Sequence, residues 1–249
     1  MNNEIKGMKE NILKIAHISG EGHIASSFSI LDILYVLYNQ VKTEDDLFIL
    51  SKGHASLALY AVLCQQGYYK LEDFISFGLF HSDFGGHPNR NKLKEIIAST
   101  GSLGHGLPIA VGIALSKKIN GEKGKVYCLI GDGESNEGTI WESSLLAAQY
   151  KLDNLVVILD NNHSTDRSVI LHHIRTKFKN FDYIVTLING HNHQEIYEAL
   201  MVKCNMPSMI IADTIKGYGC HTMEHKPAWH HKSPNAEELN MLLEELDDA

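Results

Sequence analysis

Residues 125–138 read KVYCLIGDGESNEG, and they join a continuous apolar run to a glycine-flanked carboxylate, Asp132. A second apolar run, NLVVILDNN at residues 154–162, ends in Asn162, thirty positions after Asp132. Uninterrupted apolar strands of this kind are typical of a parallel sheet that is buried on both faces. Asp132 and Asn162 are therefore expected at the carboxyl ends of two strands, where open α/β sheets bind their ligands.

The remainder of the chain alternates between helical and strand patterns. Apolar spacing and glycine stops predict helices over residues 4–19, 29–40, 54–67, 105–118, 139–150 and 195–202. Short apolar runs predict strands over residues 46–51, 125–132, 154–162, 183–188 and 208–214. This alternation predicts one α/β domain over residues 1–249, with a parallel sheet covered by helices on both faces.

Composition narrows the class of protein. The chain has 44% apolar and 21% charged residues, which is typical of a globular domain, and its net charge of -8 argues against nucleic acid as the main partner. No apolar run approaches the roughly 20 residues that span a bilayer, and the charged N-terminal stretch has no signal core. The sequence therefore predicts a cytoplasmic protein that is not a membrane protein.

The Asp132–Asn162 pair suits a hard divalent cation. Magnesium prefers oxygen ligands and is often shared between a few protein groups and a bound phosphate. Gly131 and Gly133 leave room for a diphosphate to approach the main chain, and the following helix N-terminus favours negative charge. A plain β-turn is the alternative interpretation of Gly-Asp-Gly, and spacing alone does not identify the ligand.

The stretch GDGESNEG…LDNLVVILDNN resembles the fingerprint of the thiamine diphosphate-dependent enzymes. The resemblance implies that Asp132, Asn162 and the main-chain carbonyl of Ser164 bind Mg²⁺, for which Ca²⁺ or Mn²⁺ can substitute. It also implies that Gly133 lies against the diphosphate of the cofactor. The cofactor itself performs the carbon chemistry in these enzymes.

Further motifs resemble the transketolase branch of that family, over nearly the whole chain. Four stretches, SGEGHIASSFSILDIL, SKGHASLALYAVL, GGHPNR and KGYGCHTMEHKPAWHHKSP, each contain a histidine that the resemblance implies is catalytic: His23, His54, His87 and His231. It also implies that His54 and His231 contact the cofactor. Ketol transfer between sugars or sugar phosphates moves protons near neutral pH, which suits imidazole groups.

The stretch TGSLGHGLPIAVGIAL resembles the loop in which Gly101 and Leu103 pack on the cofactor. Glu137 matches an acid that links the two active sites of the dimer through a proton network, and it is counted with the catalytic residues. Two roles stay open for His105 in the same loop: contact with the cofactor, or capping of a turn. Lys232 and Tyr218 depart from the family pattern on the substrate side, so the acceptor sugar stays undetermined.

Single-chain transketolases are longer and carry a pyrimidine-binding domain and a C-terminal domain, for which this sequence shows no motif. The chain therefore resembles the diphosphate-binding subunit of a split transketolase in carbohydrate metabolism. The resemblance implies a partner subunit that supplies the pyrimidine domain, in a heterotetramer of two-fold symmetry. Two alternatives are a subunit of a 2-oxo acid dehydrogenase or deoxyxylulose phosphate synthase, and a non-catalytic regulatory subunit. The SKGHAS and WHH motifs argue against the former, and the four histidines argue against the latter.

Overall fold

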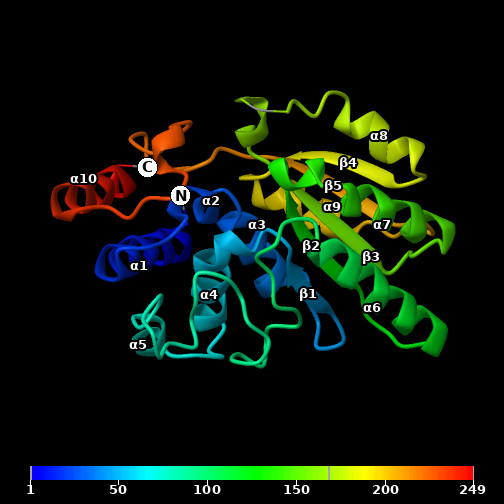
Figure 1. The fold of residues 1–249 in the computed structure, drawn as a ribbon, viewed down its shortest axis with the longest axis horizontal. Coiled ribbons are helices and arrows are strands. Elements are labelled where there is room, and N and C mark those ends of the chain that lie inside the picture. Colours follow the sequence, from blue (N-terminus) through cyan, green and yellow to red (C-terminus); the bar gives the residue numbers. More distant parts are fainter. Residues whose placement is uncertain (1, 168, 249) are drawn as a thin grey trace.

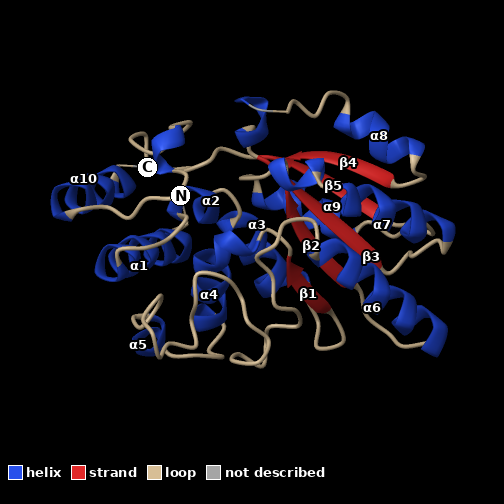
Figure 2. Ribbon diagram, viewed as in Figure 1, coloured by secondary structure: helices blue, strands red, loops and turns tan. Residues whose placement is uncertain are grey.

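The computed structural model describes residues 2–167 and 169–248. Five parallel strands form one sheet in the order β1-β2-β3-β5-β4 (Figure 2). The strands are β1 (Leu47–Leu50), β2 (Val126–Gly131), β3 (Leu155–Asn161), β4 (Ile184–Asn189) and β5 (Ser208–Asp213). Each coincides within one residue with a stretch predicted as a strand, so the expected parallel sheet is confirmed.

The helices lie on both faces of this sheet (Figure 1). They are α1 (Asn3–Ser19), α2 (Ile24–Phe28), α3 (Leu31–Val36), α4 (Ser56–Gln65), α5 (Leu71–Phe74), α6 (Gly106–Asn120), α7 (Gly138–Gln149), α8 (Ile174–Asn180), α9 (His193–Met201) and α10 (Ala236–Asp247). No helix among the described residues is both long and apolar enough to cross a membrane.

Local sequence signals account for the ends of the longest helices. The side chain of Asn2 accepts a hydrogen bond from the Glu4 amide at the start of α1, and Gly20 ends that helix with φ of 72°. Asn235 and Glu238 form a reciprocal capping box at the start of α10. These polar contacts satisfy backbone groups that a helix terminus otherwise leaves unpaired.

One predicted helix differs from the structure. The predicted helix over 29–40 divides, because α3 ends at Val36 and a π-helical turn, Leu37–Val41, follows it. A 3₁₀ turn, Gly133–Asn136, follows Gly-Asp-Gly, and α7 begins at Gly138, within one residue of the helix predicted over 139–150. The short helices α2, α5 and α8 were not predicted, because their seven or fewer residues give too short a window for a helical period.

Alternate side chains along the strands point into two separate hydrophobic cores. Leu129 and Ile158 point to the core that contains α1, α3, α4 and α9, whereas Cys128 and Val157 point to the core that contains α6 and α7. Because side chains alternate along a strand, both faces of β2 and β3 are buried, which explains their continuous apolar sequences.

Leu129 is expected to be a major contributor to stability, because its side chain is fully buried in β2. Leu129→Ala should lower the free energy of unfolding by about 2–5 kcal/mol, measured by urea denaturation. Leu145→Ala is the matched control on α7, where the leucine is 59% exposed, and it should change stability by less than about 0.5 kcal/mol. Equal losses in the two variants would contradict the two-core description.

Candidate functional site

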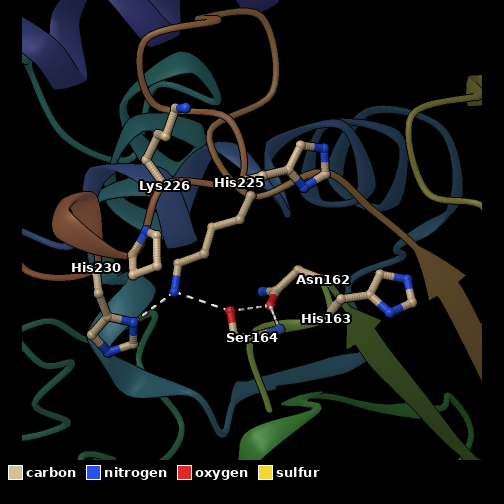
Figure 3. Close-up of a pocket in the computed structure, with 8 residues that line it drawn as sticks. Asn162, His163, Ser164, His225, Lys226 and His230 are labelled. Atoms are coloured by element: carbon tan, nitrogen blue, oxygen red, sulfur yellow. Dashed lines mark hydrogen bonds between the residues drawn. The ribbon is translucent and has the colours of Figure 1, made fainter. Parts of the chain in front are cut away.

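A polar pocket of about 370 Å³ lies at the carboxyl ends of β1, β2, β3 and β5. Its lining residues come from stretches far apart in the sequence and are His23, Ser26, Lys52, His54, His87, Gly101, Leu103, Gly131, Asp132, Gly133, Glu134, Asn162, Ser164, Lys216 and His230. A second cavity of about 430 Å³ adjoins it and shares Asn162, Ser164, Lys216 and His230 (Figure 3). The strand-end position expected from the sequence is confirmed for Asp132 and Asn162.

The oxygens of Asp132 and Asn162 converge on one short piece of backbone. Asp132 Oδ2 accepts a hydrogen bond from the Thr165 amide at 3.1 Å, and Asn162 Oδ1 accepts one from the preceding amide, that of Ser164, also at 3.1 Å. The main chain brings the strand ends together as well, because the Asp132 amide donates to the Asp160 carbonyl. Figure 3 shows Asn162 and Ser164 side by side at the edge of the second cavity.

A buried ion pair orients Asn162. Its Nδ2 donates to Asp160 Oδ2 at 2.7 Å, so its Oδ1 faces the Ser164 backbone. Asp160 in turn pairs with Lys52, and both side chains are at most 1% exposed. Lys52 holds the pKa of Asp160 below its usual value against the opposing effect of burial. The amide oxygen of Asn162 is therefore aimed by charged groups beneath it.

The histidines predicted from separate motifs do come together. The ring of His23 lies 5.0 Å from that of His54 and 4.5 Å from that of His231, measured between centroids. The backbone explains part of this proximity, because His23 and Lys232 form an isolated parallel bridge. His87 reaches the same pocket beside Gly101, where an added Cβ would lie 3.2 Å from the His87 ring.

The closing motif contributes His230 to the pocket lining, next to the predicted His231. Lys216 Nζ donates to His230 Nδ1 at 2.6 Å and lies 3.1 Å from Ser164 Oγ. The neutral His230 ring therefore carries its proton on Nε2. His231 lies outside the lining residues of both cavities and packs its ring against His23. Lys232 is also outside the lining, with its ammonium paired with Glu238 and placed over the Trp229 ring.

Burial keeps the His23 and His54 imidazoles neutral. Burial, together with the neighbouring His231 and His230, lowers the pKa of His23 to about 3. Burial and the charge of Lys52 lower the pKa of His54 to about 2. Burial, together with Lys52, likewise lowers the pKa of Lys216 to about 8. At neutral pH the His23 and His54 rings are therefore uncharged.

The pocket fits an anionic cofactor held through a metal ion. Ser26 lines the pocket, and its Oγ is a buried polar atom without a hydrogen-bond partner among the described residues. A Cβ added at Gly133 would meet no atom within 4 Å, so the main chain is open to close approach there. Burial raises the pKa of Asp132, and a divalent cation would favour its charged form. No three His, Cys, Asp or Glu side chains of the described chain could hold a metal by themselves, so a metal bound here would also need amide or carbonyl oxygens.

The remaining predicted residues occupy different surroundings. Gly101 and Leu103 line the pocket, as their motif suggests. Glu137 is exposed at the N-cap position of α7 and lies outside the lining residues. His105 Nδ1 contacts the Leu103 carbonyl at 3.0 Å, so it holds the turn and does not line the pocket.

Sequence reasoning missed several lining residues, among them Ser26, Lys52, Glu134, Lys216 and His230. Lys52 and Lys216 follow β1 and β5 closely, so the strand-end rule applied to Asp132 and Asn162 would have found them. Glu134 lies inside the GDGESNEG stretch, and His230 lies one position from the predicted His231.

A parallel sheet with a polar pocket at its strand ends defines a cofactor-binding α/β domain. The family model described as "Transketolase, thiamine diphosphate binding domain" matches residues 11–247. The chain therefore belongs to the transketolase family and carries its thiamine diphosphate-binding domain.

Comparisons with individual relatives support the same family assignment. The chain is 36% identical to one of the subunits of the apulose-4-phosphate transketolase of Actinobacillus succinogenes, covering 98% of this chain and 94% of that protein. It is 34% identical to a 6-deoxy-6-sulfo-D-fructose transketolase subunit of Clostridium sp., covering 92% and 89%. The crystal structure of transketolase from Campylobacter jejuni superposes with a TM-score of 0.89 at 30% identity, covering 99% of this chain but 43% of that one.

The neutral His54 is expected to make stability depend on pH. Its folded pKa lies below its ordinary value of 6.5, so the unfolded chain binds the proton first as the pH falls. His54 therefore has no effect on the free energy of unfolding well above pH 6.5, and it lowers that free energy progressively as the pH falls below 6.5. Between pH 7.5 and 5.5, wild type should lose up to about 1.4 kcal/mol more than His54→Gln in urea denaturation. Identical pH dependence in the two proteins would contradict the neutral buried ring.

Proposed function

We propose that this chain is the diphosphate-binding subunit of a two-subunit transketolase. It would hold thiamine diphosphate through Mg²⁺ and contribute histidines to the transfer of a two-carbon ketol unit between sugars or sugar phosphates. One observation carries the proposal: the oxygens of Asp132 and Asn162 meet at consecutive amides beside a cluster of neutral imidazoles.

The chain's own groups suit this cofactor. Asp132, Asn162 and the Ser164 carbonyl are the proposed ligands of Mg²⁺, with Ca²⁺ or Mn²⁺ as substitutes. The proposed cofactor contacts are shared between open backbone, an apolar side chain and polar groups: Gly133, Gly101, Leu103, Ser26, His54 and Lys216. When bound, thiamine diphosphate supplies the stabilisation of carbanions that this chemistry requires.

The histidines are proposed to handle protons of the sugar. A neutral imidazole can take a proton from a sugar hydroxyl and return it to the product, at a pocket lined by His23, His54, His87 and His230. His231 is retained as a proposed contributor from the same motif, and its ring contact supports a role through His23. Glu137 is proposed to act at the interface with another chain, which its exposure permits.

A partner subunit is proposed to carry the pyrimidine-binding domain. The Actinobacillus succinogenes relative has nearly the same extent as this chain, and its name describes it as one subunit of a transketolase. Apolar side chains on α6 and α7 support a contact surface near the site, because Ile109, Leu145 and Leu146 are 40–59% exposed. The assembled enzyme is proposed to be a cytoplasmic heterotetramer of two-fold symmetry.

The substrate class is proposed to be an anionic ketose. The two relatives are named for apulose-4-phosphate and for 6-deoxy-6-sulfo-D-fructose, which carry a phosphate and a sulfo group. Lys216 and Lys226 line the second cavity beside the site, so cationic groups are available to such a substrate. The partner chain is proposed to add further positive charge.

Activity is expected only in the assembled enzyme. The chain mixed with its partner, thiamine diphosphate, Mg²⁺ and a ketose phosphate donor should transfer a ketol unit to an aldose acceptor, followed by chromatography of the sugars. The isolated chain should be inactive, and Asp132→Ala should abolish the Mg²⁺-dependent reaction. Consumption of pyruvate with no use of ketose phosphates would contradict the proposal and favour a 2-oxo acid enzyme.

Adjacent histidines offer a direct comparison. His230→Ala should lower kcat/KM by about 10²–10⁴-fold, because an acid–base group lining the pocket is lost. His231→Ala should lower it by less than about tenfold, because its ring acts through His23. Steady-state kinetics of both variants in the assembled enzyme would decide the matter. A larger loss for His231→Ala would assign the proton-transfer role to that residue.

A further inference from the structure

The Glu134 carboxylate lies beneath the pocket and joins three segments of the chain. Its side chain is 2% exposed. Oε1 accepts hydrogen bonds from Ser51 Oγ, after β1, and from the Gly104 amide at 2.8 Å. Oε2 accepts one from the Gly131 amide at 3.0 Å, at the end of β2. Both oxygens are therefore engaged by donors of the chain itself.

Gly104 belongs to the cofactor loop, residues 101–105, and it is held from both sides. Thr139 Oγ1, on α7, donates to the Gly104 carbonyl at 2.8 Å, while Glu134 accepts from its amide. Gly104 has φ of 82°, and an added Cβ would lie 2.5 Å from Thr139 Oγ1. The next turn is equally close, because a Cβ at Gly106 would lie 2.4 Å from Ser51 Oγ. Contacts to the backbone therefore position this loop.

The chemistry of the three donors requires a carboxylate at this position. Two amides and a hydroxyl donate to two oxygens, whereas a glutamine side chain offers one acceptor oxygen and would turn an NH₂ group toward a donor. A buried donor left without an acceptor is costly, and hydrogen bonds to charged groups are stronger than neutral ones. An isosteric Gln is thus expected to release the loop without creating a cavity.

We propose that Glu134 is a positioning residue, which fixes the cofactor loop at Gly101 and Leu103 relative to Asp132 and Gly133. Glu134 acts through Gly104 and Gly131 and does not itself touch the reacting atoms. The inference rests on the proposed function for its consequence, the affinity for thiamine diphosphate. The position of the loop is a property of the chain alone, so it can be tested separately.

Hydrogen–deuterium exchange of the full-length chain tests the loop directly. In Glu134→Gln, peptides covering residues 101–106 should exchange about tenfold faster than in wild type, while those covering α10 are unchanged. Thr139→Val, which removes the other support of Gly104, should accelerate the same peptides. Glu142→Gln is the matched control, since Glu142 is exposed on α7, and it should change neither region. Unchanged exchange in the loop, or equal acceleration in α10, would overturn the proposal.

Calorimetric titration of thiamine diphosphate with Mg²⁺ into the chain assembled with its partner tests the consequence. Glu134→Gln should weaken binding about 10–100-fold, while kcat at saturating cofactor stays within about threefold of wild type. A wild-type complex that fails to bind the cofactor would contradict the proposed function. The exchange experiment would still test whether Glu134 positions the loop. Equal affinity of wild type and Glu134→Gln would overturn the positioning role alone.

Discussion

The site depends on the buried carboxylate of Asp160 more than on any other single group. Asp160 pairs with Lys52 and accepts hydrogen bonds from Ser29, Thr214 and Asn162. These donors come from the loop after β1, the α2–α3 junction, the loop after β5, and the end of β3 itself. One residue at the centre of the sheet therefore ties four segments together. A buried charge of this kind is stable only when its partners are complete.

Two buried carboxylates, Asp160 and Glu134, position different parts of the pocket. Asp160 aims the oxygen of Asn162, and Glu134 accepts from the backbone of the loop that carries Gly101 and Leu103. Asp132 also lines the pocket, and the Thr165 and Gly133 amides donate to its oxygens. Lys52 and Lys216 offset part of this negative charge and, after burial, are further causes of the lowered pKa of His54 and His230. The pocket thus combines hydrogen-bonded side-chain oxygens with uncharged imidazole rings.

The sequence predicted the parallel sheet and the strand-end position of Asp132 and Asn162 because both depend on local pattern. A buried parallel strand needs an unbroken apolar run, as in 154–162, and its last polar residue falls at the ligand edge. Pattern was less informative for short or irregular elements. No periodic signal marks the five-residue α2 or the π-helical turn Leu37–Val41, whose form depends on packing against other elements.

The sequence by itself determined the fold class, the family and the motifs that supply the site, since these follow from residue order and spacing. Only the tertiary structure decided which of two adjacent histidines lines the pocket and which packs against His23. It also decided that Lys52, Glu134 and Asp160 support the site from beneath. These are long-range contacts between segments 83 to 108 residues apart. Such contacts depend on how distant segments pack together. Local sequence patterns do not indicate them, because they reflect only residues that are near one another in the chain.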